Sequence, residues 1–551
     1  MKASRTADVW WKNAIIYCLD VERYQDSNGD GVGDFAGLTE RIEHLARLGV
    51  SCLWLMPFYP SPNRDDGYDI TDYYSVDSRL GTLGDFVETM RTARSHGIRV
   101  IADLVVNHTS DQHPWFLESR SSKTNPKRDW YVWRDEPPAD HAEGVMFPDA
   151  EDSRWTRDGR TRQHYLHHFY SHQPDLNLAN PEVRDEIARV MGFWMELGLS
   201  GFRVDAVPYM LEGTEDHDEP EVPDPHDFLA DLRAFMVRRR GDAAMLGEVN
   251  LDYPELMPYF GDQREELAMC FDFPGSQALF LALARQHPGA LVKALERRPQ
   301  PAGDGQWAVF LRNHDELTLD QLSESERDEV FEAFGADPEM QVFGRGLRRR
   351  LPTMMGGDRQ RLRMAYSLLY SLPGTPVLFY GEEIGMAENL DIDGRMAVRT
   401  PMQWTAGHNA GFSTAATDDL VALPPDGVYG PAECNVEVQL EDPNSLLSWI
   451  TLLIRRRRER SEFGWCEVAL VPADHEAVFA HAATYRGSTV VAVHNFADQP
   501  LEVKLSPDGL KPGLELFDQL VEGSGNPEPV TIASDGTLTL TLERYGCRWL
   551  Y

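Results

Sequence analysis

Residues 201–206 read GFRVDA, a short apolar run that ends in an aspartate and an alanine and carries an arginine within it. Seven other apolar runs, each followed by polar residues, are spaced along the chain: AIIYCL (14–19), CLWLMP (52–57), RVIADLVV (99–106), AAMLGEV (243–249), CFDFP (270–274), WAVFLRN (307–313) and PVLFYGEE (376–383). Loops rich in Gly, Asp or Asn and then helical patterns follow these runs, which is typical of parallel β/α units. Eight such units predict an α/β protein built on a closed (β/α)8 barrel.

The spacing of the runs indicates two additions to the barrel. Roughly 95 residues separate the third run from the fourth, although a crossover between parallel strands needs only about a dozen or more. Residues 107–178, rich in His, Trp, Tyr, Asp and Pro, are therefore predicted to form a loop-rich lobe inserted after strand 3. Alternating segments such as TLTLTL predict a C-terminal antiparallel β-sandwich domain over 465–551. The barrel itself is assigned to 1–106 and 179–464.

Composition and charge narrow the class of partner. The chain has 551 residues, of which 42% are hydrophobic and 26% charged, as in an ordinary globular protein. Its 53 basic and 89 acidic residues leave a net charge of −36, which repels nucleic acid and anionic membranes. We interpret the arginine-rich stretches 348–350 and 455–460 as solvated or carboxylate-paired helix ends. We therefore expect neither nucleic acid nor a membrane as partner.

Targeting and cysteine patterns point to the cytoplasm. The N-terminal residues have no apolar core of signal-peptide length, and no stretch offers about 18 uninterrupted apolar residues for a membrane span. The six cysteines lie far apart with no C-x-x-C spacing, which predicts reduced thiols in the core instead of a disulfide scaffold.

Four acidic residues stand at the ends of predicted barrel strands: Asp103 in IADLVVNH, Asp205 in GFRVDA, Glu248 in MLGEVN and Asp315 in LRNHDE. Barrel enzymes place their catalytic groups at this face. Any one of these acids alone would be a structural carboxylate on a helix cap or an arginine. Four acids on four strands, with His108, Arg203 and His314 close to them in the sequence, instead indicate an active site, because buried acids are costly unless they are paired.

Clustered carboxylates suit glycoside chemistry, in which one acid attacks the anomeric carbon and another protonates the leaving oxygen. Arg203 stands two residues before Asp205 on the same face of a strand, so we expect it to keep that carboxylate ionised. Glu248 is expected to hold a proton instead, because a neighbouring negative charge and partial burial raise its pKa.

The strings DLVVNH, GFRVDA, GEVN and RNHDE, in this order, resemble the α-amylase superfamily of retaining glycoside hydrolases and transglycosylases, and the resemblance covers essentially the whole chain. It implies Asp205 as the nucleophile, Glu248 as the acid/base and Asp315 as the acid that binds the sugar hydroxyls. The resemblance also places four further side chains in the same subsite: Asp103, His108, Arg203 and His314.

The string NRDDGYDI (63–70) resembles the segment that closes the non-reducing end of the pocket in exo-acting members. By this resemblance Tyr68 stacks on a bound glucose and Asp65 pairs with Arg399 of VRTPMQW, which leaves room for one glucosyl unit. Taken alone, Tyr68 would be an ordinary packing aromatic, so the exo interpretation depends on the whole string.

A second kind of motif concerns metal binding. DSNGDGVGD (26–34) reproduces the first nine positions of a Ca²⁺ loop, whose oxygen ligands would be Asp26, Asn28, Asp30, the Val32 carbonyl and Asp34. The twelfth position is Gly37 instead of a bidentate Glu, so a sensor EF-hand is not expected and an Asx-rich turn is the alternative. The resemblance implies a structural Ca²⁺ here, with Mg²⁺ as the alternative.

A second candidate set of metal ligands comprises Asn107, Asp175, Glu212 and the carbonyls of Tyr209 and Met210. Glycosyl transfer itself requires no metal, and no organic cofactor is expected.

Within the superfamily, FRVDAVPYMLE and LRNHDELTLD look most like the trehalose synthases, which interconvert maltose and trehalose. This implies intramolecular glucosyl transfer on a disaccharide, with some hydrolysis to glucose. An exo-acting α-glucosidase is the alternative if water reaches the intermediate, and a sucrose-isomerising or other transglucosylase is a third. A catalytically silent binding subunit is disfavoured because all three catalytic acids are present. Homo-oligomerisation and a maltose-phosphorylating kinase as partner stay open.

Overall fold

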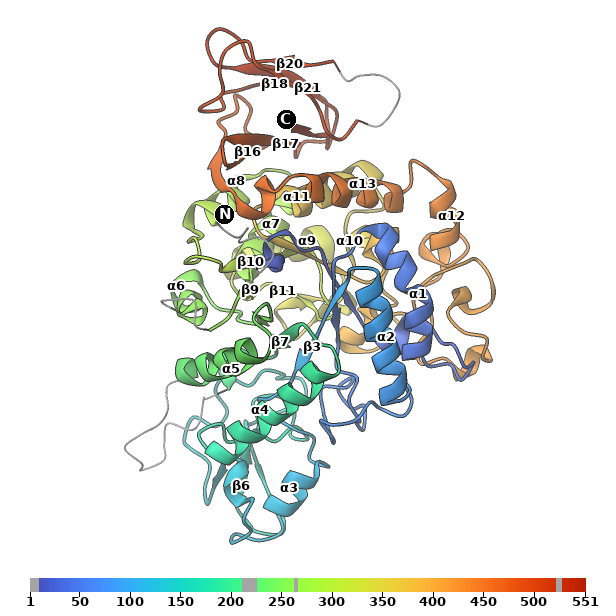
Figure 1. Ribbon diagram of the computed structural model, residues 1–551, viewed down its shortest axis with the longest axis vertical. Coiled ribbons are helices and arrows are strands. Elements are labelled where there is room, and N and C mark those ends of the chain that lie inside the picture. Colours follow the sequence, from blue (N-terminus) through green and yellow to red (C-terminus); the bar gives the residue numbers. More distant parts are fainter. Residues whose placement is uncertain (1–8, 211–224, 262–265, 522–527) are drawn as a thin grey trace.

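The centre of the molecule is a closed barrel of eight parallel strands. The computed structural model describes residues 9–210, 225–261, 266–521 and 528–551. The barrel strands are β1 (Ile16–Leu19), β2 (Cys52–Leu55), β3 (Arg99–Leu104), β7 (Gly201–Val204), β8 (Ala244–Gly247), β9 (Met269–Phe271), β10 (Gln306–Phe310) and β14 (Thr375–Phe379). They neighbour one another in chain order, and β14 closes the ring on β1 (Figure 1). All eight coincide with the predicted apolar runs, so the (β/α)8 fold is confirmed.

Helices cover the outside of the barrel. The longer ones are α1 (Phe35–Leu48), α2 (Leu83–Ser95), α4 (Pro181–Glu196), α5 (Pro225–Arg239), α7 (Phe273–Arg285), α8 (Gly289–Arg297), α9 (Glu324–Phe334), α11 (Arg359–Ser371) and α13 (Leu446–Glu459). The shorter ones are α6 (Tyr253–Leu256), α10 (Leu351–Met354), α12 (Val436–Glu441) and α14 (Glu462–Trp465). Local chemistry sets where they begin: Thr82 and Asp85 form a reciprocal capping box at α2, and Asn180 caps α4. Their apolar faces and the buried strands make one continuous core.

Strand register brings the polar ends of β3, β7 and β8 together. Asp103 on β3 lies opposite Arg203 on β7, and Val204 lies opposite Gly247 of β8. The residues that follow these two positions are Asp205 and Glu248, so both acids leave the barrel side by side at its carboxyl end.

Between β3 and β7 the chain forms a lobe with little regular structure. It contains α3 (Pro114–Ser119) and an antiparallel sheet in the order β4 (Trp133–Arg134), β6 (His164–Leu166), β5 (Trp155–Arg157). An isolated bridge between His108 and Asp175 closes the base of the lobe. The lobe lies at the end of the molecule opposite to the C-terminal strands (Figure 1).

The C-terminal part is an antiparallel β structure, as predicted. One sheet consists of β15 (Glu467–Leu470), β16 (Val478–Tyr485), β17 (Ser488–Asn495) and β22 (Cys547–Leu550); two strand pairs are β18 (Leu501–Leu505) with β21 (Leu538–Leu542) and β19 (Glu515–Leu516) with β20 (Val530–Thr531). In β21 the leucines are buried and the threonines exposed, which is the expected period-2 alternation. The buried side chains of both layers form one apolar cluster.

The arginine-rich stretches differ in part from their interpretation as solvated helix ends. Arg349 pairs with Glu388 at 2.9 Å, which agrees with a carboxylate-paired role. Arg350 and Arg457, however, are buried and donate to backbone carbonyls, because a guanidinium has enough donors to satisfy several of them at once. All six cysteines are free, and four of them are buried. Among the described residues, every helix is too short or too polar to cross a bilayer.

Candidate active site

A buried arginine lies between three carboxylates at the carboxyl end of the barrel. Arg203 is 1% exposed, and its Nη1 binds Asp205 at 2.5 Å and also Asp103. Its Nη2 binds Glu248 at 2.7 Å. Because one planar guanidinium holds both Asp205 and Glu248, the two carboxyl groups are fixed relative to each other. Ala206, which follows Asp205, has a φ of 51° and donates its N–H to Glu248 at 3.1 Å.

The two acids differ in protonation. Burial raises the pKa of Asp205 to about 6, although Arg203 opposes the rise. Burial also raises the pKa of Glu248 to about 7, again against Arg203, and the charge of Asp205 adds to this rise. Between these two values Asp205 is predominantly ionised while Glu248 predominantly holds a proton, which are the states that a nucleophile and a general acid require.

Aromatic side chains orient this cluster. Trp54 donates its indole N–H to Asp103 at 2.8 Å. The Tyr68 ring stacks on His314 with centroids 5.6 Å apart, and its hydroxyl lies 2.7 Å from His314 Nε2. His108 Nε2 lies 3.1 Å from the Tyr68 carbonyl oxygen. The predicted subsite residues therefore lie together, and the contact of Tyr68 with glucose stays a prediction.

Asp315 is the third predicted catalytic acid and is held by two arginines. Arg395 binds it at 2.8 Å and Arg399 at 3.0 Å. Burial alone would raise the pKa of Asp315, but its interaction with His314 and then the guanidinium groups of Arg395 and Arg399 hold that pKa below its ordinary value. Burial lowers the pKa of His314 well below its ordinary value, so the ring beside Asp315 is neutral at neutral pH.

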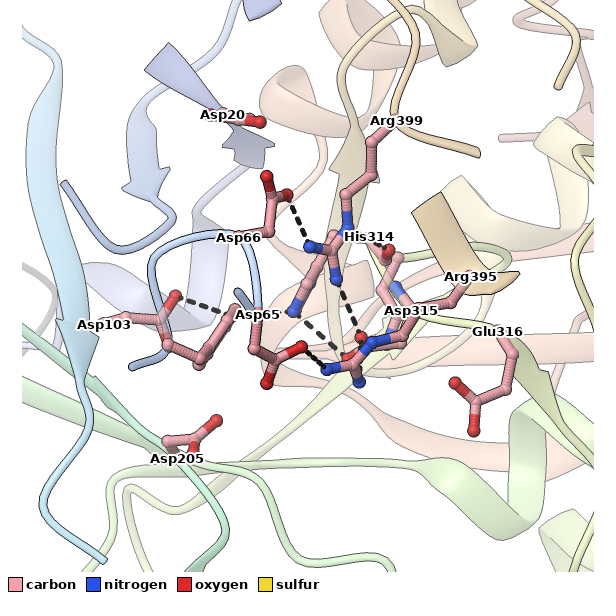
Figure 2. Close-up of polar contacts among 12 residues, drawn as sticks. Asp20, Asp65, Asp66, Asp103, Asp205, His314, Asp315, Glu316, Arg395 and Arg399 are labelled. Carbon is pink, nitrogen blue, oxygen red and sulfur yellow. Dashed lines mark hydrogen bonds and ion pairs between the residues drawn. The ribbon is translucent and has the colours of Figure 1, made fainter. Parts of the chain in front are cut away.

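The expected pair of Asp65 with Arg399 is wrong. Arg399 binds Asp66 at 2.6 Å, whereas Asp65 binds Arg395 at 2.7 Å and accepts from Gln173 at 2.9 Å (Figure 2). The physical reason is the backbone at Asp66, whose φ of 51° turns the two adjacent carboxylates toward different partners. Two Asp–Arg pairs, instead of one, close this side of the pocket.

Two adjoining cavities contain these residues. The inner chamber, about 60 Å³, is lined by Asp65, Tyr68, His108, Phe169, Asp205, Glu248, Asp315 and Arg395. The outer chamber, about 120 Å³, adds among others Met146, Phe147, Tyr209, Asn250, Glu316 and Arg345. Phe169, Glu248, Asp315 and Arg395 line both chambers, so the acid/base candidate Glu248 stands at their junction.

The loop 26–34 uses many of its oxygens to hold its own backbone. Asp26 accepts the N–H groups of Asn28, Gly29 and Gly31, and Asp34 caps α1 by accepting from Gly37. In the described part of the chain, no three His, Cys, Asp or Glu side chains form a group that could hold a metal ion. A cation here would therefore depend on mixed carboxylate, amide and carbonyl oxygens, a donor set that Ca²⁺ accepts.

The second candidate metal set is only partly described. Asn107 donates to Asp175 at 3.3 Å, and Asp175 also pairs with His168. Tyr209 and Met210 lie at the end of a 3-10 helix, and Glu212 lies outside the described residues. This set stays a prediction.

Several residues of the pocket carried no recognisable local signal. Arg395 stands four positions before Arg399, across the short 3-10 helix Gly394–Val398, and nothing in the string around it indicates that it binds two acids of the site. Phe169 and Gln173 come from the inserted lobe, where no periodicity places a side chain. Trp54 lies on β2, whose four residues are all apolar and buried, so no alternation in the sequence indicated the side chain that donates to Asp103.

The closed barrel and its carboxylate cluster supply the paired acids that glycosyl transfer requires. A family model described as alpha amylase, catalytic domain, matches residues 17–332 and 342–464, and a model described as sucrose hydrolase-like, C-terminal domain, matches 487–551. The chain belongs to the α-amylase family.

Known relatives refine this assignment. The chain is 43% identical to a trehalose synthase of Thermus thermophilus over 93% of its own length, but spans only 53% of that relative. It is 41% identical to the trehalose synthase/amylase TreS of Mycolicibacterium smegmatis, covering 90% of this chain and 86% of the relative. Among solved structures, a variant of the trehalulose synthase MutB in complex with Tris is similar with a TM-score of 0.78 at 28% identity, covering 98% of this chain and 99% of that one.

Proposed function

We propose that this protein isomerises maltose to trehalose by intramolecular α-glucosyl transfer with retention of configuration. The observation that carries the proposal is the shared contact of Asp205 and Glu248 with Arg203 at the junction of two small chambers. The choice of maltose as the substrate is supported by the similarity to trehalose synthases over most of the chain.

In the first step the non-reducing glucose of maltose occupies the inner chamber. The Asp205 carboxylate attacks its anomeric carbon, and the bond to the bridging oxygen breaks as Glu248 gives that oxygen its proton. The products are a β-glucosyl ester of Asp205 and a free glucose in the outer chamber. Asp315, kept ionised by Arg395 and Arg399, is in position to accept hydrogen bonds from the sugar in the inner chamber.

In the second step the released glucose turns within the outer chamber and presents its anomeric hydroxyl. Glu248, now a carboxylate, takes the proton from this hydroxyl while the oxygen attacks the glucosyl carbon and Asp205 leaves. Two inversions at the same carbon give net retention. If water takes the place of the turned glucose, the same intermediate yields glucose.

Incubation with maltose and isotopically labelled free glucose tests the proposal. Trehalose without label is the expected product, because the released glucose stays in the outer chamber. Labelled disaccharide would instead indicate an open acceptor site, and glucose as sole product would make the protein an α-glucosidase.

Asp205→Asn is expected to lower kcat by at least about a thousandfold. Asp508→Asn, at an exposed position, is the matched control and is expected to leave kcat unchanged.

We further propose that the loop 26–34 binds Ca²⁺ in a structural role. The proposal is supported by its Asp, Asn and carbonyl oxygens and by its place directly before α1, which Asp34 caps. A chelator is expected to lower Tm by several degrees, with recovery on adding Ca²⁺, and Asp30→Ala is expected to reduce this difference while Asp508→Asn preserves it. An equal Tm with chelator and with Ca²⁺ contradicts the proposal.

A further inference from the structure

A strained hairpin tip faces the inserted lobe beside the outer chamber. The hairpin joins β12 (Gln341–Val342) to β13 (Gly346–Leu347), which also pairs with β11 (Leu317–Thr318). At its tip the N–H of Arg345 donates to the Val342 carbonyl at 3.3 Å. The two residues between them, Phe343 and Gly344, have φ values of 55° and 63°. Turns with positive φ at both central positions favour Gly, Asn or Asp, so a phenylalanine is an unfavourable choice for the backbone here.

The contacts of the tip explain what an aromatic side chain does at this position. The Phe343 ring lies 4.9 Å from the Phe147 ring of the inserted lobe, and Phe147 stacks on Tyr170 at 4.4 Å. Beside it, Arg345 donates to the Met146 carbonyl at 2.8 Å. Two residues of the hairpin tip, on either side of Gly344, thus contact two adjacent residues of the lobe.

These contacts extend to the reaction centre. Phe147 lines the outer chamber and lies 5.5 Å from the guanidinium of Arg395, which binds Asp315. Arg345 also lines the outer chamber, where its Nη2 lies 3.6 Å from Glu316. Phe343 is thus connected to the outer chamber through its contact with Phe147, which lines that chamber.

We propose that Phe343 is a positioning residue that determines the acceptor, favouring the retained glucose over water by pressing Phe147 onto the outer chamber. The inference rests on the proposed glucosyl transfer and deepens it. In this view the unfavourable backbone at Phe343 serves to exclude water from the glucosyl-enzyme, which a glycine or asparagine at this position would not do.

The test compares Phe343→Asn with a matched control. Arg486 occupies the equivalent position of the hairpin between β16 and β17, with a φ of 53° and with Gly487 next to it at 83°, and it is exposed and remote from the site. Asparagine suits both turns, so Phe343→Asn and Arg486→Asn are each expected to keep or raise Tm. Only Phe343→Asn is expected to raise the ratio of glucose to trehalose formed from maltose, by severalfold, and Phe343→Tyr is expected to restore the parental ratio.

An unchanged ratio in Phe343→Asn, or an equal change in Arg486→Asn, overturns the inference. If the parent protein makes no trehalose, the proposed function fails by itself. The partition of its glucosyl-enzyme between added labelled glucose and water then still tests Phe343, because Phe343→Asn must shift that partition toward water.

Discussion

At the scale of single residues, Arg203 shows how one cation serves two acids that must hold different charges. Its guanidinium lowers the pKa of both Asp205 and Glu248, yet burial is the larger effect for each of them. Neighbouring carboxylates add to the rise of the pKa at both groups: Asp103 and Asp315 at Asp205, and Asp205 and Asp315 at Glu248. The order of the two pKa values, about 6 and about 7, therefore assigns the roles.

These two pKa values predict a narrow bell-shaped pH profile of kcat/KM. Below about 6 Asp205 takes up a proton and loses its nucleophilic form, and above about 7 Glu248 loses the proton that it must donate. Initial rates with maltose across the pH range measure both limbs. With α-glucosyl fluoride, whose leaving group needs no proton, the alkaline limb of the first step is expected to disappear. A profile that stays flat across both values would refute the assignment.

At the scale of elements, the site depends on how closely β7 approaches β8. Gly201 begins β7, and a Cβ atom built on it would lie 1.9 Å from the Ala244 carbonyl oxygen. The close approach sets the register in which Val204 meets Gly247, and hence places Asp205 beside Glu248. A side chain at Gly201 would push the strands apart, because the obstacle is backbone and cannot rotate away.

Gly201→Ala is therefore expected to lower the free energy of unfolding by about 1–3 kcal/mol or more and to reduce kcat. Urea unfolding and maltose turnover measure the two effects. Gly241→Ala is the matched control, because a Cβ at Gly241 meets nothing within 4 Å. Equal stability of the two variants would contradict the role given to this contact.

At the scale of the whole molecule, two buried histidines join the C-terminal domain to the barrel. His494 Nε2 lies 2.9 Å from the Ser367 hydroxyl, and His481 Nε2 lies 2.9 Å from the Ser371 carbonyl oxygen, both on α11. Burial lowers the pKa of His481 to about 4 and that of His494 well below its ordinary value. The junction is thus built on neutral imidazoles.

Acid is expected to weaken this junction. Above the unfolded pKa of about 6.5 both states are neutral and stability is complete; as the pH falls toward the folded value, only the unfolded chain binds the proton. For His481 alone the loss between about pH 7.5 and about pH 5 amounts to about 2 kcal/mol. His481→Gln is expected to reduce that loss in urea unfolding, whereas the exposed His96→Gln is expected to preserve it. A loss that is the same in both variants would rule out His481 as its source.

The features that could be predicted from the sequence are those that depend on a local pattern of apolar and polar residues. Apolar runs such as GFRVDA end in polar residues because a barrel strand must be buried along its length and open at its carboxyl end, so the eight strands and the acids Asp103, Asp205, Glu248 and Asp315 could be read along the chain. The inserted lobe could be placed from spacing alone, but which of its side chains reach the pocket could not.

By itself, then, the sequence determined the barrel, the antiparallel C-terminal domain and the acids at the strand ends, because burial periodicity is a local property of the chain. Only the tertiary structure decided that Arg399 binds Asp66 while Asp65 binds Arg395, and that Phe343 meets Phe147. The reason is that a side chain's partner depends on the backbone angle at one residue and on where distant segments meet. Neither the backbone angle nor the meeting of distant segments can be predicted from the spacing of residue types along the chain.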